Sequence, residues 1–275
     1  MKRSRNSRAV VTGAGSGIGQ AFALELAKRG GQVVCSDIDE DAAGRTADEI
    51  AGRGGKALPL RCDVSSIAEV EALARDAQEW FGDFPSMVVN NAGVGIGGTA
   101  IGQTPLDDWQ WTLGINLWGV IYGCHVFVPL LREAGAGGVI NVASAASFGS
   151  APQMGPYNVS KAGVLALSET LAAELSGTGV HVTVLCPTFV KTNIVENGRI
   201  STQSQHAASV LMRVVGMSAE RVARSCLDTH DRGGLYVMPQ LDAKLLWRAK
   251  RTAPGVFTKV TGVANRIGPL KREGD

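Results

Sequence analysis

Short apolar runs alternate with longer segments of helical period along most of the chain. The apolar runs are rich in β-branched residues and end in glycine, proline or polar residues, which is typical of buried strands. They lie at 9–13, 32–37, 57–64, 86–93, 138–144, 180–187 and 233–239. Between most of them, apolar positions recur every three to four residues. This spacing predicts amphipathic helices at 19–30, 40–54, 66–82, 104–135 and 156–177.

The alternation itself predicts a fold class. Strand–helix–strand units of this length give parallel strands, because each helix returns the chain to the same edge of the sheet. We therefore expect an α/β protein with a doubly wound parallel sheet and helices on both faces. Neither a low-complexity linker nor an internal repeat divides the chain, so residues 1–240 are predicted to form a single domain.

Composition and charge narrow the functional classes. The chain has 275 residues, 45% of them hydrophobic, and a net charge of +2, which gives no reason to expect nucleic-acid binding. The five cysteines lack C-x-x-C spacing and the four histidines lack ligand spacing, so neither group predicts a metal site. The start does not resemble a signal peptide, and the apolar stretch 119–131 is shorter than a bilayer span. We expect a soluble, cytoplasmic protein.

A glycine-rich turn, "TGAGSGIG" at 12–19, separates the first strand from the first helix. Its glycines, Gly13, Gly17 and Gly19, do not have the G-x-G-x-x-G spacing. A turn in this position still lets backbone N–H groups approach a pyrophosphate at the helix N-terminus. The sequence therefore predicts a Rossmann-like dinucleotide site.

The acidic residue that ends the second strand bears on the choice of cofactor. The carboxylate of Asp37 could accept both adenosine-ribose hydroxyls of NAD and would repel the 2′-phosphate of NADP. Ser16 stands where a lysine or arginine could pair with that phosphate. These residues favour NAD. The alternative is that Asp37 caps the helix that starts near Asp39.

The stretch "YNVSKAG" at 157–163 places a phenol and an ammonium on one helical face, since Tyr157 and Lys161 are one turn apart. A free phenol has a pKa of about 10 and is a poor base at neutral pH. A cation beside the phenolate favours ionisation. Lowering the pKa to about 7–8 takes roughly 3–4 kcal/mol of differential stabilisation, which Lys161 and the charge of a bound nicotinamide could supply together.

From about residue 8 to residue 240 the chain resembles the classical short-chain dehydrogenase/reductase family. The family's motifs occur in order as "TGAGSGIG" (12–19), "CDV" (62–64), "NNAG" (90–93), "GINLWG" (114–119), "VINVASAAS" (139–147) and "YNVSKAG" (157–163). The resemblance implies that Tyr157 is the catalytic acid/base and that Lys161 also binds the nicotinamide ribose. It implies that Ser144, at the end of the fifth strand, hydrogen-bonds the substrate oxygen.

The resemblance also implies a role for Asn116, which would hold a water in a proton relay. An asparagine inside a helix can instead satisfy backbone groups at a kink, and both roles can hold. The cofactor contacts are predicted at Gly13, Ser16, Gly17, Ile18, Gly19, Asp37, Asp63, Val64, Asn90, Ala92, Gly93, Tyr157, Lys161, Pro187, Val190 and Thr192. Among them, Asp63 and Val64 would hold the adenine, and Val190 and Thr192 the carboxamide.

One segment departs from the family's pattern, and the segment after it bears on substrate specificity. In "CPTFVKT" (186–192), Thr188 replaces the usual glycine, which would alter the pocket floor or the placement of the ring. Residues 193–217 correspond to the family's mobile lid. Apolar side chains there and near the catalytic serine favour a neutral, hydrophobic alcohol or ketone, or else simply pack the lid: Ile96, Phe148, Met154, Val210, Leu211, Val214, Val215 and Met217. The glycine cluster 93–98 is interpreted as a flexible loop.

The C-terminal extension, 241–275, is basic and amphipathic. Packing on a neighbouring subunit or on the lid is the favoured interpretation. Association with an anionic membrane surface and disorder are the alternatives.

The sequence thus predicts an NAD-dependent oxidoreductase acting on a secondary alcohol or its ketone. The first alternative is an NADPH-dependent ketone or 3-oxoacyl reductase. The second is a catalytically silent, cofactor-binding regulatory protein. Small and apolar residues in the helices 104–135 and 156–177 predict a homodimer or homotetramer, as in the family.

Overall fold

The computed structural model describes residues 2–192, 194, 198–201, 205, 212 and 215–267. Several predicted features lie outside these residues. They are most of the lid, with Val210, Leu211 and Val214, and the final basic residues Lys271 and Arg272.

A parallel sheet forms the centre of the protein, with seven strands in the described residues and the order β3-β2-β1-β4-β6-β7-β9. The strands are β1 (Arg8–Thr12), β2 (Gln32–Asp37), β3 (Lys56–Arg61), β4 (Met87–Asn90), β6 (Gly137–Val142), β7 (Val180–Leu185) and β9 (Tyr236–Val237). All of their pairings are parallel. The order reverses at β1, so the prediction of a doubly wound α/β fold is confirmed.

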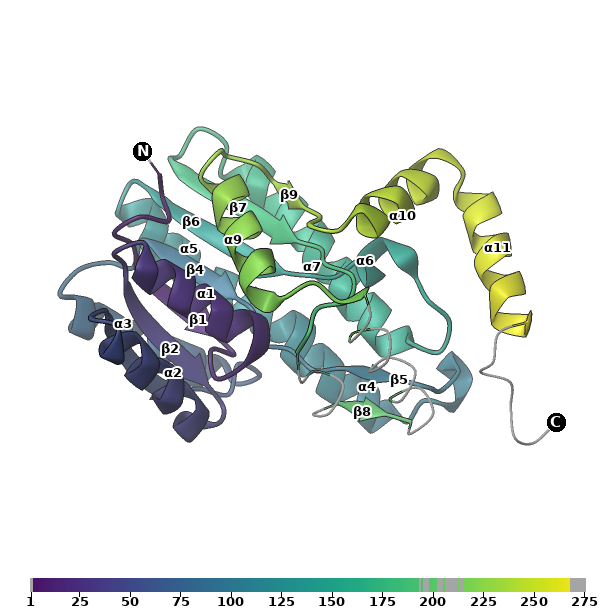
Figure 1. Ribbon diagram of the computed structural model, residues 1–275, viewed down its shortest axis with the longest axis horizontal. Coiled ribbons are helices and arrows are strands. Elements are labelled where there is room, and N and C mark those ends of the chain that lie inside the picture. Colours follow the sequence, from purple (N-terminus) through teal and green to yellow (C-terminus); the bar gives the residue numbers. More distant parts are fainter. Residues whose placement is uncertain are drawn as a thin grey trace.

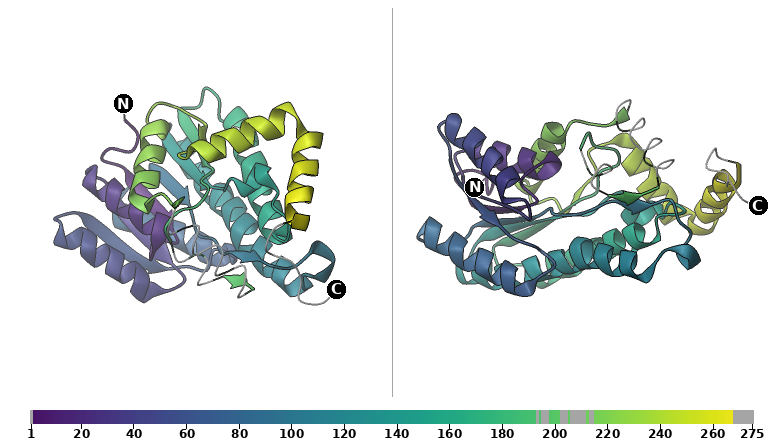
Figure 2. Two further views of the ribbon diagram at one scale, coloured as in Figure 1. Left: turned by 45° about the vertical axis from the view of Figure 1, so that its right-hand side comes forward. Right: turned by 90° about the horizontal axis from the view of Figure 1, so that it is seen from below.

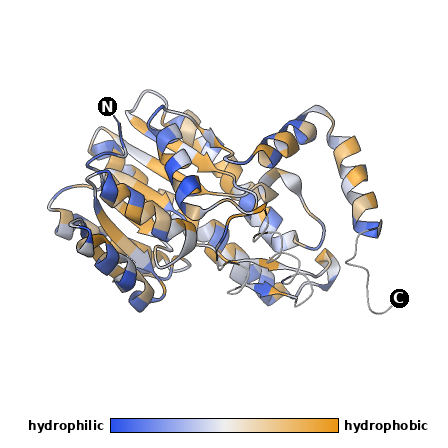
Figure 3. Ribbon diagram, in the orientation of Figure 1, coloured by the Kyte–Doolittle hydropathy of each residue, from blue (hydrophilic) through white to orange (hydrophobic). Residues whose placement is uncertain are grey.

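Two helical layers cover the sheet, as Figures 1 and 2 show. One layer contains α1 (Gly17–Lys28), α2 (Glu40–Gly52) and α9 (Ala219–His230), and the other α3 (Ile67–Phe81), α5 (Gly119–Glu133) and α7 (Gly155–Glu174). Successive strand residues face opposite layers, so Ala9 and Val11 pack beneath α1 while Val10 packs on the other side. Burial on both faces explains why the central strands are almost uniformly hydrophobic in Figure 3.

Six of the seven predicted strands end earlier than expected, and the early ends of β3, β4 and β6 place predicted site residues beyond the ladder, at the carboxyl edge of the sheet. The ladder stops at Arg61 in β3, at Asn90 in β4 and at Val142 in β6. Ser144, predicted to end its strand, therefore lies in the loop that follows. Apolar sequence continues past these points, so its pattern does not show where the partner strand turns away.

The segment 104–135 is predicted as one helix, and the structure has a continuous helix over Leu106–Glu133 that contains a π turn. Residues Ile101–Gln103 form a 3-10 turn, α4 spans Leu106–Leu113, and a π turn at Gly114–Trp118 leads into α5. The continuous stretch Leu106–Glu133 is long and apolar enough to cross a membrane by length and composition. Here it packs against β4, β6, α3 and α7, and 39% of its most apolar window is buried. A cytoplasmic location stays a prediction.

The glycine-rich loop 93–98 contains a short strand. In it, β5 (Ile96–Gly97) pairs in parallel with β8 (Arg199–Ile200). The interpretation of 93–98 as a flexible loop was therefore wrong for Ile96 and Gly97. The partner strand lies about a hundred residues away in sequence, so local composition could not reveal it.

The C-terminal extension is helical as far as residue 267. Helix α10 (Leu241–Thr252) buries Ala243 against the body, and the ring of Trp247 lies 6.1 Å from that of Tyr236. Helix α11 (Pro254–Ile267) stands apart from the sheet and its helical layers in Figures 1 and 2. Its valines at 256, 260 and 263 are exposed. The helical structure of 241–267 does not match the alternative of disorder, and subunit packing and membrane association stay predictions.

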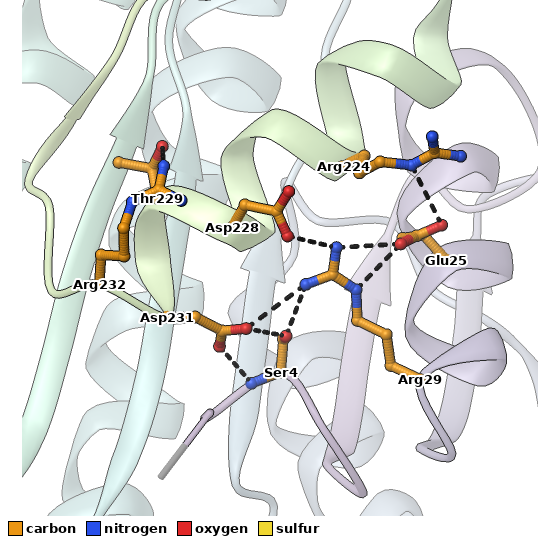
Figure 4. Close-up of polar contacts among 8 residues, drawn as sticks. All are labelled: Ser4, Glu25, Arg29, Arg224, Asp228, Thr229, Asp231 and Arg232. Atoms are coloured by element: carbon orange, nitrogen blue, oxygen red, sulfur yellow. Dashed lines mark hydrogen bonds and ion pairs between the residues drawn. The ribbon is translucent and has the colours of Figure 1, made fainter.

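A charged cluster ties the N-terminal segment to α1 and α9 (Figure 4). The guanidinium of Arg29 lies 2.9 Å from Glu25, 2.8 Å from Asp228 and 3.4 Å from Asp231. Asp231 also accepts hydrogen bonds from the backbone N–H and the hydroxyl of Ser4. Since Arg29 is largely buried, its three carboxylate partners offset the cost of burying its charge.

We expect acid to destabilise the protein through His230, the last residue of α9. The hydroxyl of Thr183 donates to the carbonyl of Gly234, so Nδ1 of His230 must donate to Thr183 at 2.9 Å. Among the described residues, Nε2 has no hydrogen-bond partner. A proton on Nε2 would therefore be buried without an acceptor, and burial lowers the pKa of His230 from 6.5 to about 4.

The unfolded chain thus binds this proton at a higher pH than the folded protein does. The contribution of His230 to the free energy of unfolding is complete above pH 6.5 and is lost as the pH falls towards about 4. The melting temperature should fall over this range, and less steeply in His230→Gln, measured by scanning fluorimetry. Equal slopes for both proteins would show that other groups cause the acid sensitivity.

Candidate active site

A cavity of about 520 Å³ opens at the carboxyl edge of the sheet. Residues at or just after the ends of six strands line it, namely Gly13, Asp37, Cys62, Ala92, Val142 and Pro187. In a doubly wound sheet, the strand order reverses at such a point and leaves room for a ligand between diverging loops.

The turn after β1 is shaped by its glycines. Gly13 and Gly17 have φ values of +64° and +56°, in the left-handed region that favours glycine. At Gly19 an added Cβ would lie 2.0 Å from the carbonyl oxygen of Gly13, so only glycine lets α1 approach the turn this closely. Gly19 was predicted to contact the cofactor, but it does not line the cavity. It packs against Gly13 on the side of the turn away from the cavity.

The N-terminus of α1 opens into the same cavity without a side-chain cap. Ser16, its N-cap residue, makes no capping hydrogen bond, and the first turn contains no acidic residue. In contrast, Asp39 caps α2 and Ser66 caps α3. The first N–H groups of α1 and its dipole are therefore available to an anion.

A second contact fastens the turn to the end of β4. The hydroxyl of Thr12 accepts hydrogen bonds from the backbone N–H groups of Asn91 and Ala92, at 3.0 and 3.1 Å. The side chain of Asn91 donates to the carbonyls of Thr12 and Gly13. Asn91 thus lines the cavity and positions the turn.

Asn90, predicted to contact the cofactor, does not line the cavity. It is buried between strands, and its Nδ2 donates to Oδ1 of Asn141 at 2.8 Å. The motif "NNAG" alone cannot show which asparagine faces inward. Strand alternation decides it, because consecutive side chains point to opposite faces.

Asp37, the residue predicted to bind the adenosine ribose, lines the cavity. Its Oδ2 accepts from the N–H of Gly15 at 2.8 Å, and its Oδ1 accepts from the N–H of Asp39 at 3.1 Å. These bonds hold the carboxylate at the cavity wall and leave further lone pairs. The alternative that Asp37 caps α2 does not match the geometry, since the side chain of Asp39 accepts from Ala42 instead.

Ser144, Tyr157 and Lys161 meet at the other end of the cavity. Nζ of Lys161 lies 5.9 Å from the centre of the Tyr157 ring and donates to the carbonyl of Val142 at 3.0 Å. The Oγ of Ser144 accepts from the N–H of Ala146, and the Ser144 side chain is hydrogen-bonded to Tyr157. The i, i+4 spacing on α7 thus places the pair as expected.

Burial dominates the electrostatics of this pair. It raises the pKa of Tyr157, and the hydrogen bond with Ser144 opposes it. Burial lowers the pKa of Lys161 to about 8. The phenol is therefore neutral at neutral pH in the protein alone.

Asn116 lies in the π turn and does not line the cavity. Its Oδ1 accepts from the N–H of Val94 at 2.7 Å, and its Nδ2 donates to the carbonyl of Val94 at 2.9 Å. A Cβ added to Gly93 would lie 3.0 Å from Oδ1 of Asn116 and 3.4 Å from Nζ of Lys161, so the three groups are neighbours. This geometry matches the alternative in which Asn116 satisfies backbone groups at a kink.

The apolar wall differs from the one expected for the substrate. Ile96, Phe148, Met154, Val215 and Met217 do not line the cavity. Other side chains, which the sequence did not indicate for the substrate, line the cavity instead. Two of them, Ile38 and Cys62, lie just beyond the ends of β2 and β3. Others are Val94, Trp111, Ile115, Ile194 and Met212. Trp111 and Ile115 are one turn apart, a spacing that could have indicated a common face near Asn116.

Comparisons with known proteins agree with this arrangement. Residues 7–202 match the short chain dehydrogenase family. The chain is 45% identical over 186 residues to "Probable oxidoreductase EphD" of Mycobacterium tuberculosis, a match that covers 67% of this chain and only 31% of that protein. It is 36% identical over 218 residues to 1-deoxy-11-beta-hydroxypentalenate dehydrogenase of Streptomyces exfoliatus, covering 76% and 79% of the two chains.

A solved structure is also similar over almost the whole chain. It is a short chain dehydrogenase/reductase from Burkholderia phymatum in complex with NAD. The two chains share 33% sequence identity and superpose with a TM-score of 0.88. The match covers 93% of this chain and 96% of the other.

Proposed function

Because the chain belongs to the short-chain dehydrogenase family, we propose that it is an NAD-dependent oxidoreductase that transfers a hydride between a secondary alcohol, or its ketone, and the nicotinamide. One observation carries the proposal. Ser144, Tyr157 and Lys161 line the same cavity as Asp37 and the turn at the uncapped N-terminus of α1.

The residues present fit a dinucleotide. The α1 N-terminus suits the pyrophosphate, and Asp37 suits the adenosine ribose. Asp63, Val64, Val190 and Thr192 line the cavity; the first two would hold the adenine and the last two the carboxamide. Bound NAD would supply the hydride acceptor and a positive charge near Tyr157.

The protein's own residues would control the proton and the substrate oxygen. Tyr157 takes the hydroxyl proton of the alcohol during oxidation and returns it during reduction. The charge of Lys161 favours the phenolate once Tyr157 begins to ionise, and Ser144 holds the substrate oxygen by a hydrogen bond. Because the pKa of Tyr157 is raised in the protein alone, we propose that ionisation is coupled to cofactor binding.

The substrate class follows from the lining of the catalytic end. Val94, Trp111 and Ile115 line the same cavity as Tyr157 and add apolar surface to it. Among the described lining residues, the charged side chains are Asp37, Asp63 and Lys161, and the two acids lie at the adenosine end. No arginine is among these described lining residues to pair with a substrate carboxylate, so a neutral, hydrophobic alcohol or ketone fits best.

The direct test is a panel of secondary alcohols and ketones, assayed with both cofactors by NADH or NADPH absorbance. Oxidation of apolar alcohols with NAD, and little with NADP, would support the proposal. Turnover with NADPH alone would favour the ketone or 3-oxoacyl reductase. Tight cofactor binding without turnover of any substrate would favour the catalytically silent regulator.

We also expect a dimer or tetramer with closed symmetry. Only 39% of the most apolar window in Leu106–Glu133 is buried, and Trp118 and Val159 are about half exposed. Such apolar surface is typical of a protein interface. Light scattering at micromolar concentration should give a multiple of the 28.7 kDa chain mass.

Two variants locate the interface. Val159→Glu on α7 should shift the mass towards the monomer. The same change at Val256 on α11 tests whether the C-terminal helices take part. A monomeric wild type would contradict the prediction.

A further inference from the structure

The segment that follows β7 forms the wall of the cavity at the nicotinamide end. Pro187, Thr188, Val190 and Thr192 all line it. Three backbone hydrogen bonds outside α10 hold this segment: the N–H of Ala145 donates to the carbonyl of Pro187, the N–H of Met217 donates to that of Phe189, and the N–H of Lys191 donates to that of Met217. The segment therefore keeps these anchors when any contact with α10 is removed.

Strand β9, which pairs with β7, ends before it can pair with this segment. The N–H groups of Val184 and Cys186 donate to the carbonyls of Leu235 and Val237, and there β9 ends. In a parallel ladder, the next N–H to need a partner is that of Thr188. The chain beyond β9 turns towards α10 and supplies no backbone partner.

The side chain of Gln240 takes the place of the missing strand. Its Oε1 accepts from the N–H of Thr188 at 3.3 Å, and its Nε2 donates to the carbonyl of Phe189 at 3.0 Å. A carboxamide has the same donor and acceptor as a peptide group, so it can extend the ladder by one step. Gln240 is only 8% exposed, and it does not itself line the cavity.

Thr188 adds a second connection to α10. Its hydroxyl donates to Oδ1 of Asp242 at 3.1 Å, and the same oxygen accepts from the N–H of Ala243 in the first turn of the helix. The glycine usual at this position in the family could not make this bond. The departure from the family pattern at Thr188 therefore coincides with a contact to the C-terminal extension.

We propose that Gln240 is a positioning residue for the nicotinamide wall, that Thr188 and Asp242 support it, and that α10 is thereby part of the reaction site. The proposal rests on the proposed function, because that wall matters only if a nicotinamide binds against it. Gln240 acts through the backbone of Thr188 and Phe189. Its loss should shift the wall while leaving the pyrophosphate and ribose contacts in place.

The test compares Gln240→Met, which keeps the length and removes both hydrogen bonds, with Gln78→Met on α3 as the matched control. In Gln240→Met we expect faster hydrogen exchange at the amide of Thr188 and a shifted fluorescence emission of bound NADH. The dissociation constant for NADH should change less than about threefold, and kcat should fall about 10- to 100-fold with KM much less affected. Gln78→Met should match the wild type.

Substitutions at Thr188 separate positioning from general destabilisation. Thr188→Val should shift the emission of bound NADH in the same direction as Gln240→Met does. Thr188→Ser, which keeps the hydroxyl, should have the wild-type emission. A Gln240→Met protein with wild-type exchange and NADH emission would overturn the proposal. So would a lower melting temperature with unchanged emission, because that result describes a purely structural role.

Failure of the proposed function would be visible separately in the wild type. If no alcohol or ketone is turned over but NADH binds, the emission and exchange measurements still decide the role of Gln240. If the wild type does not bind NADH, both proposals are wrong.

Discussion

Replacing Tyr157 with phenylalanine should lower kcat by at least about 10²–10⁴-fold, the range typical of losing a general acid/base. The substitution removes one hydroxyl and keeps the ring that packs beside Lys161. The hydroxyl's described partner is Ser144, which keeps its own bond from the N–H of Ala146. The fold and the NADH dissociation constant should therefore remain nearly unchanged.

The matched control is Tyr122→Phe, which deletes the same hydroxyl on α5, away from the cavity lining. It should keep wild-type turnover. Rates would be measured by NADH absorbance on a verified alcohol, and binding by fluorescence titration. Wild-type turnover in Tyr157→Phe would show that another group carries the proton.

Lys161→Ala should lose a comparable factor in turnover and also bind NADH more weakly. Its Nζ is buried and bonded to the carbonyl of Val142, so the ammonium is held beside Tyr157 rather than free in solvent. Removing it takes away the nearest cation from the phenolate and a proposed donor to the nicotinamide ribose. Normal NADH affinity in Lys161→Ala would restrict its role to catalysis.

The second large effect concerns cofactor choice. We expect the wild type to prefer NADH over NADPH by about 10²-fold or more in dissociation constant, equivalent to about 2.8 kcal/mol. With NADPH, the 2′-phosphate would replace a ribose hydroxyl beside Asp37 and place two anions in contact. The bonds from Gly15 and Asp39 fix the carboxylate, so it cannot turn away without losing them.

Asp37→Ala should weaken NADH binding and relieve the repulsion of NADPH. Both changes lower the ratio of the NADPH dissociation constant to the NADH dissociation constant. Adding Ser16→Arg should lower it further by supplying a partner for the phosphate. Asp39→Ala is the matched control. It removes the cap of α2 and should cost about 0.5–2 kcal/mol in the free energy of unfolding, with no change in the cofactor ratio.

Fluorescence titration of both reduced cofactors is sufficient for this comparison. Equal or tighter binding of NADPH by the wild type would contradict the proposed role of Asp37. An altered ratio in Asp39→Ala would instead show that the position of α2 contributes to cofactor choice.

The sequence alone determined the features that depend on near neighbours in the chain. Strand β2 was predicted with its observed bounds, Gln32–Asp37, because an apolar run between a glycine pair and an acid is a local signal. The glycine turn and the i, i+4 pair on α7 were likewise predicted in place. In each case the residues that matter lie within one strand, one turn or one helical repeat.

Only the tertiary structure decided which polar residues face the cavity and where each strand ends. Asn90 binds Asn141 in the sheet interior while Asn91 lines the cavity, and the π turn directs Asn116 to the backbone of Val94. The contact of Gln240 with Thr188 joins residues 52 positions apart. Such contacts depend on partners that are distant in sequence, and hydrophobic periodicity contains no information about them.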